Sequence, residues 1–194
     1  MSGPSNDRDE ALAAATKRGI RWDAAAAIIA SLVGLLALVV AGYTAYIQRQ
    51  QVSAQVWPYL MMAGSDVSTE YMWLNKGVGP AQVESVEVLV NGKPQKDWRV
   101  VLASMQLGKP AYRQSTLNGN VVSAGEKVDW LEFSNRDDFL AFRAAARQTK
   151  FAVKLCYCST LGDCWTNDTS KGEWNDRHAV GKCPAVPESR QFQD

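Results

Sequence analysis

The sequence predicts a mainly β domain that follows one N-terminal transmembrane helix. A long uncharged apolar stretch near the N-terminus predicts the helix. After it, short segments rich in β-branched and aromatic residues alternate with Gly, Asn and Pro, a pattern typical of strands joined by turns. Only two segments in this second part have the residue spacing of an amphipathic helix.

No charged residue occurs from Ala24 to Gln48, and a helix of this length measures about 37 Å. A hydrocarbon core is about 30 Å thick, so we expect residues 23–48 to cross a bilayer and residues 49–55 to form a juxtamembrane linker. The rings at its two edges are expected at headgroup level: Trp22, Tyr43 and Tyr46. A cleaved signal peptide is the alternative, but its apolar region is shorter, about 7–15 residues.

Basic residues flanking the apolar stretch predict its direction. Lys17, Arg18 and Arg21 precede the stretch, whereas Arg49 stands alone after it until Lys76. The positive-inside rule therefore places residues 1–22, a polar tail, in the cytoplasm and the C-terminal domain outside it.

Small residues recur along the predicted span at helical spacing: Ala26, Ala30, Gly34, Ala37, Ala41 and Ala45. Such a stripe lets two membrane helices approach closely, which favours a homo-oligomer or packing on another membrane subunit. The alternative is that alanine is simply common in membrane spans.

Residues 56–183 are expected to form the β-rich domain. The candidate strands are residues 56–62, 68–75, 82–90, 128–133 and 151–157. Asn91 and Gly92 tolerate positive φ and predict a hairpin. Several short strands with two short helices favour an immunoglobulin-like antiparallel β-sandwich, with an α+β fold as the alternative. Residues 184–194, which include two prolines, are expected to form a C-terminal tail that leaves the core.

The two short helices are predicted from capping residues and spacing. Asp97 can cap a helix whose apolar residues share one face: Trp98, Val101, Leu102 and Met105. Ser134 to Asp137 resembles a capping box with Asp in place of Glu, ahead of a helix that ends near Gln148.

All four cysteines lie near the C-terminus: Cys156, Cys158, Cys164 and Cys183. An even number outside the cytoplasm predicts two disulfides. A hairpin loop between Cys158 and Cys164 favours that pair together with Cys156–Cys183, and pairing of Cys156 with Cys164 and of Cys158 with Cys183 is the alternative. A zinc site and a C-x-C redox pair are weaker alternatives, because neither the spacing nor the setting is usual for them.

The sequence predicts no enzyme, no cofactor and no small-molecule substrate. Its 21 basic and 20 acidic residues nearly cancel, so no net field predicts nucleic-acid binding. The single histidine, His178, lies in a polar segment and is expected at the surface. Gly77 and Gly79 are expected in a turn and not in a nucleotide motif. Two carboxylate pairs remain, Asp137–Asp138 in a first helical turn and Glu84/Glu87 on a strand face expected to be exposed.

Three segments carry a resemblance to a known group of proteins: residues 56–60 (VWPYL), residues 75–81 (NKGVGPA) and the cysteine segments 156–159 and 164–165. Together they make the chain, over residues 20–175, resemble a group of uncharacterised bacterial membrane proteins with one N-terminal span and a small β-rich domain. The resemblance implies a bacterial inner-membrane protein with a periplasmic domain, and it implies no activity.

These features predict a membrane-anchored interaction or accessory module, either a subunit of a membrane assembly or a self-associating protein. Its expected partners are the lipid bilayer and a membrane protein or a second copy of the chain. The alternatives are a periplasmic thiol-based enzyme, and a sensor or effector controlled through the transmembrane helix.

Overall fold

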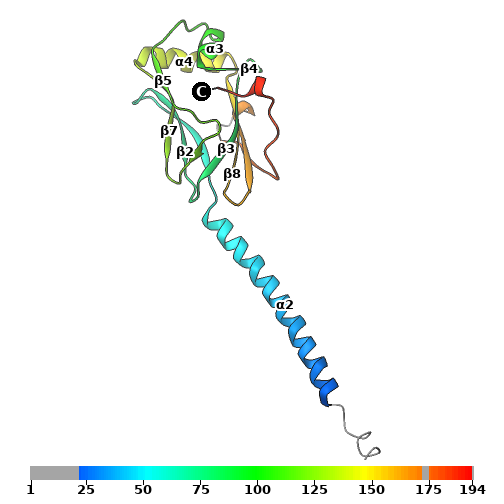
Figure 1. Ribbon diagram of the computed structural model, residues 1–194. Helices are drawn as coiled ribbons and strands as arrows, with labels where there is room; N and C mark the ends of the chain where they lie inside the picture. Colours follow the sequence, from blue (N-terminus) through cyan, green and yellow to red (C-terminus); the bar gives the residue numbers. More distant parts are fainter. Residues whose placement is uncertain (1–21, 172–174, 194) are drawn as a thin grey trace, which may run out of the picture. The chain divides into compact units, whose positions relative to one another are not determined.

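A computed structural model describes residues 22–171 and 175–193 (Figure 1). The chain divides between Gln50 and Gln51 into two compact units, one helical and one β-rich. The predicted cytoplasmic tail, with Lys17, Arg18 and Arg21, lies outside the described residues.

The first unit is built on helix α2 (Trp22–Gln55), which runs unbroken through the predicted span and the predicted linker. It has no buried residue, and its most apolar stretch has a mean hydropathy of 2.7. By length and composition it is a candidate membrane-spanning helix. Ser31 and Thr44 bond back to the helix, to Ile28 O and Val40 O at 2.8 Å each, so neither hydroxyl needs an external partner.

The β-rich unit contains two antiparallel sheets. In spatial order, the first consists of β1 (Leu60–Ser65), β2 (Glu70–Asn75), β7 (Lys127–Phe133) and β5 (Tyr112–Gln114). The second consists of β10 (Arg177–Val180), β9 (Cys164–Asp168), β8 (Ala152–Cys158), β3 (Ala81–Val90) and β4 (Lys93–Gln95), with β6 (Val121–Val122) also paired with β3. The mainly β prediction and the N-terminal apolar helix are thus confirmed.

Two α-helices complete the domain, α3 (Trp98–Ser104) and α4 (Arg136–Gln148), with two short 3-10 turns, η1 (Thr169–Lys171) and η2 (Glu188–Arg190). Asp97 caps α3 as predicted, accepting a hydrogen bond from Val100 N at 3.0 Å. The predicted start of α4 is wrong by one residue. Asn135, in extended backbone conformation, is the cap and accepts from Asp138 N at 2.8 Å.

The core lies between the sheets and is dominated by aromatic rings. Trp98 of α3 packs edge-on against Trp130 of β7 and against Phe192, with ring centroids 4.7 and 5.1 Å apart. Tyr71 of β2 contacts Phe139 and Phe142 of α4, both at 5.4 Å. These ring contacts add specific geometry to the burial of large apolar surfaces.

Asn75 joins elements of both sheets and is 1% exposed. Its Oδ1 accepts from Tyr59 N at 3.1 Å and from Gly77 N at 3.0 Å. Its Nδ2 donates to Gly79 O at 2.8 Å and to Val122 O at 3.0 Å. The four polar positions of the amide are therefore all used.

The turn after Asn75 holds the chain against the segment that enters the domain. A Cβ at Gly79 would lie 1.9 Å from Val56 O, and one at Gly77 would lie 2.4 Å from Trp57 O. Only glycine fits either position, which explains the spacing of the two glycines that the sequence shows. Asn91 and Gly92, with φ of 52° and 78°, form the predicted hairpin turn between β3 and β4.

The predicted C-terminal tail is wrong, because the end of the chain is part of the core. Phe192 is fully buried, and its N–H donates to Val86 O of β3 at 2.8 Å. Arg190 forms an ion pair with Glu87 at 3.0 Å. Glu87 is therefore buried, contrary to the expected exposed strand face, whereas Glu84 is exposed. The prolines of this segment turn it along the sheet and do not release it.

We predict that Asn75→Ala lowers the free energy of unfolding by more than about 3 kcal/mol, because four buried backbone groups lose their partner. Urea unfolding of the detergent-solubilised full-length protein, followed by tryptophan fluorescence, measures the change. The matched control is Asn120→Ala, which removes one exposed bond to Thr116 O. Equal effects of the two substitutions would contradict the central role of Asn75.

We also predict that Phe192→Ala lowers the free energy of unfolding by about 3–5 kcal/mol, since it leaves a cavity between Trp98 and Trp130. The same unfolding measurement checks this value. Gln193→Ala is the control, because its side chain is exposed. A Phe192→Ala variant as stable as that control would show that the end of the chain is not part of the core.

Candidate functional site

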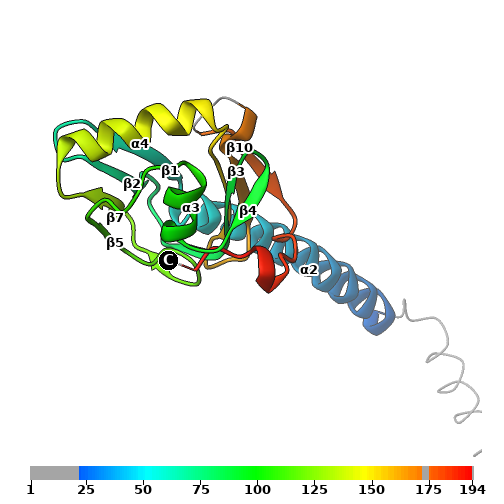
Figure 2. The same cartoon turned by 90° about the horizontal axis from the view of Figure 1, so that it is seen from above.

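A cavity of about 950 Å³ lies beside α4. Figure 2 views the domain from above and shows the course of α4. Five cationic residues line the cavity: Arg143, Arg147, Lys150, Lys154 and Arg190. Its apolar surface comes from Met62, Tyr71, Leu89, Phe139 and Phe151, and its one carboxylate comes from Asp66. The volume and the mixed lining are those of a binding cavity.

Helix α4 supplies two of the five cations. Arg143 and Arg147 are four residues apart, so they share one face of the helix, and Lys150 follows the helix, which ends at Gln148. Phe139 and Phe142 are buried and fix the orientation of this face relative to the sheets. Phe139 contacts the ring of Tyr71, which itself lies over Gly64, where a Cβ would be 3.3 Å from the ring.

Three of the five cations have carboxylate partners within the domain. Arg143 binds Asp66, with Nη1 2.6 Å from Oδ2. Lys154 binds Asp168 at 3.1 Å, and Arg190 binds Glu87. Lys154 also lowers the pKa of Asp168, together with Ser170, against the opposing effect of burial.

Tyr71 forms part of the cavity floor and titrates unusually. Burial raises its pKa to about 12, and Asp66 acts in the same direction, whereas Arg143 and Arg147 oppose the shift. The phenol therefore stays protonated through the physiological range. The cavity presents a neutral ring beneath cationic side chains.

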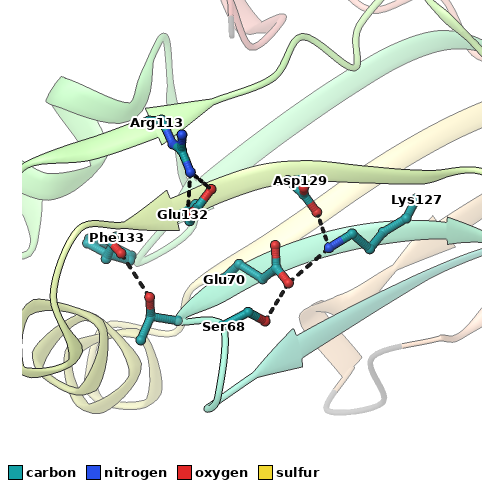
Figure 3. A network of polar contacts seen from close by, with 8 residues as sticks. Ser68, Glu70, Arg113, Lys127, Asp129, Glu132 and Phe133 are labelled. Atoms are coloured by element: carbon teal, nitrogen blue, oxygen red, sulfur yellow. Dashed lines mark hydrogen bonds and ion pairs between the residues drawn. The ribbon is translucent and has the colours of Figure 1, made fainter.

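A second polar cluster lies on β2, β5 and β7 (Figure 3). Lys127 Nζ lies 2.6 Å from Asp129 Oδ1 and 3.1 Å from Glu70 Oε1, and Ser68 also donates to Glu70. Burial opposes ionisation of Asp129, but Lys127 and Glu70 hold its pKa below the usual value. Lys127 and Asp129 belong to β7 and Glu70 belongs to β2, so the ion pair between Lys127 and Glu70 stabilises the pairing of these two strands.

The same surface carries a further ion pair, between Arg113 of β5 and Glu132 of β7, at 2.7 and 2.9 Å (Figure 3). Sequence analysis missed both parts of this network, because its members are separated by up to 57 residues and share no motif. The carboxylates that the sequence did single out have other roles. Asp137 and Asp138 lie in the first turn of α4, where the helix dipole stabilises negative charge.

The four cysteines form two disulfides, Cys156–Cys183 and Cys158–Cys164, the first of the two pairings expected. Cys158 and Cys164 are direct partners across β8 and β9. The sulfurs of Cys158 and Cys183, from different disulfides, lie 3.6 Å apart. All four sulfurs are used, so this arrangement contains none of the thiolates that a zinc site requires.

Arg177 of β10 is surrounded by aromatic rings close to where the chain enters the domain. Its guanidinium carbon lies 4.9 Å from the ring centre of Trp165, 5.0 Å from Tyr59 and 5.4 Å from Trp57. These cation–π contacts fasten β10 to the segment before β1. They give a structural role to rings that belong to two of the motifs in the sequence resemblance.

The other residues singled out from the sequence are not part of the cavity lining. His178 is exposed on β10, with Nε2 2.8 Å from Asp176 Oδ1. The small-residue stripe, from Ala26 through Ala30, Gly34, Ala37 and Ala41 to Ala45, lies on α2. So do Trp22, Tyr43 and Tyr46, whose side chains are exposed.

No family model, no curated protein and no solved structure matches this chain. The resemblance to uncharacterised bacterial membrane proteins therefore stays a prediction.

The raised pKa of Tyr71 predicts a loss of stability at alkaline pH. The folded protein favours the neutral phenol, so this contribution is present below pH 10.0 and is lost as the pH rises towards about 12. We expect the wild type to lose about 2 kcal/mol more than Tyr71→Phe over this interval. Urea unfolding at several pH values measures the difference, with Tyr43→Phe as control. Parallel curves for all three proteins would contradict the assignment.

Proposed function

We propose that this protein is a membrane-anchored interaction module. Helix α2 holds it at the bacterial inner membrane with the N-terminus in the cytoplasm, and an immunoglobulin-like sandwich projects into the periplasm. The length and hydropathy of α2 support the anchor. The two disulfides support an oxidising compartment for the domain.

The cavity beside α4 is the observation that carries this proposal. It combines an apolar floor with five cationic side chains, of which Arg147 and Lys150 have no ion-pair partner in the described residues. Apolar surface supplies affinity, and oriented charges supply selectivity for a complementary partner. A domain held on a membrane benefits from such a site, since the anchor confines it to a surface shared with its partners.

The partner is a membrane protein or a second copy of this chain. The small-residue stripe on α2 supports a role for the helix in association as well as in anchoring. A thiol-based enzyme has less support, because no cysteine is free and three of the four are buried.

Photo-crosslinking in intact host cells tests the proposal. A photoreactive residue replaces Ser170, an exposed residue of the cavity lining, or Val78, an exposed residue in the turn after β2. We expect position 170 to give one discrete adduct that position 78 does not give. Mass spectrometry then distinguishes a second copy from a different protein.

Introducing Arg147→Glu into the position-170 probe is the specificity control, and it should abolish the adduct. Identical adducts from both positions, or none from position 170, would refute a partner at this cavity.

A further inference from the structure

We infer that the cavity beside α4 binds an acidic segment of a partner polypeptide, with carboxylates at Arg147 and Lys150 and an apolar side chain on the floor. This inference rests on the proposed function, since it names the chemistry of the ligand for the same site. Three observations support it: the charges that line the cavity, the backbone conformation of Lys150 and the apolar lining.

The charges that line the cavity favour an anionic ligand. The lining holds five cations and one carboxylate. Arg143, Lys154 and Arg190 are paired within the domain, whereas Arg147 and Lys150 have no ion-pair partner in the described residues. Both are exposed at the rim, three positions apart on α4 and its C-terminal turn. Two such cations at one mouth favour a ligand with more than one negative charge.

Lys150 has a backbone conformation that is uncommon for a residue with a side chain. Lys150 follows α4 with a φ of 46°, the left-handed region that glycine normally occupies after a helix. Phe151 N donates to Ala146 O at 3.0 Å and Thr149 N to Ala145 O at 2.8 Å, which closes the helix end around this residue. A lysine here costs conformational energy that glycine would avoid, and it places an ammonium group at the cavity.

Gln106 provides an internal comparison. It follows α3 with a φ of 59°, and Leu107 N donates to Leu102 O at 3.0 Å, which closes that helix in the same way. Gln106 does not line the cavity. The two positions share their backbone geometry and differ in side-chain charge and in location.

The apolar lining of the cavity favours a peptide over a small inorganic anion as the ligand. Phe139, Phe151 and Leu89 form a surface that an aliphatic or aromatic side chain can cover. A volume of about 950 Å³ is far larger than a lone phosphate or carboxylate needs. An acidic segment with interspersed apolar residues satisfies both the rim and the floor.

Fluorescence anisotropy with full-length protein in phosphatidylcholine nanodiscs tests the inference. The probe is a rhodamine-labelled hexapeptide, EEFEEL, and QQFQQL is the uncharged control of the same shape. We expect EEFEEL to bind at least about tenfold more tightly, with a preference that weakens as salt screens the charges. Lys150→Gly and Arg147→Gln should each weaken EEFEEL about tenfold.

Gln106→Gly is the matched control and should leave EEFEEL binding unchanged. Lys150→Gly is the decisive variant, because glycine suits the backbone and the protein should remain at least as stable. Equal binding of EEFEEL and QQFQQL, or equal effects of Lys150→Gly and Gln106→Gly, would overturn the inference. Lysine-dependent binding to phosphatidylglycerol vesicles without EEFEEL binding would instead assign the site to anionic lipid.

A wrong ligand and a wrong proposed function give different experimental results. If the crosslink at position 170 forms and EEFEEL fails to bind, the interaction module stands and the acidic ligand is wrong. If the crosslink fails, the module itself is refuted at this cavity.

Discussion

The amide of Asn75 is the constraint on which the arrangement of the domain depends. Through four hydrogen bonds it joins the start of β1, the turn after β2 and strand β6 of the second sheet. The two glycines beside it let the entering chain lie against that turn without a gap. Because β2 is anchored at this end, its other end holds Tyr71 in place beneath α4, where the cavity forms.

The groups that stabilise the domain thus differ from those that are available to a ligand at the cavity. Charged groups such as Lys127 and Arg177 have partners within the domain. Two cations of the cavity lining, Arg147 and Lys150, lack an ion-pair partner in the described residues and lie at the end of α4. Placing them at the end of a capped helix, whose buried phenylalanines fix its rotation, pre-organises them for a ligand and lowers the ordering cost of binding.

Local features were predictable from the sequence, whereas features that join distant segments were not. Asn91 and Gly92 define their hairpin by backbone preference alone, and Asp97 caps α3 through a short-range bond. The cavity escaped prediction because its lining comes from separate strands, helices and turns that meet only after folding. Phe192 was misplaced since prolines nearby indicate irregular chain, and irregular chain can still deliver a ring into a core.

The burial of Phe192 has a consequence for how the domain is made. A ribosome releases this residue after all the strands have emerged, yet its ring fills the space between Trp98 and Trp130. The aromatic interior therefore stays open to solvent, or to a chaperone, until the segment that follows β10 has been made.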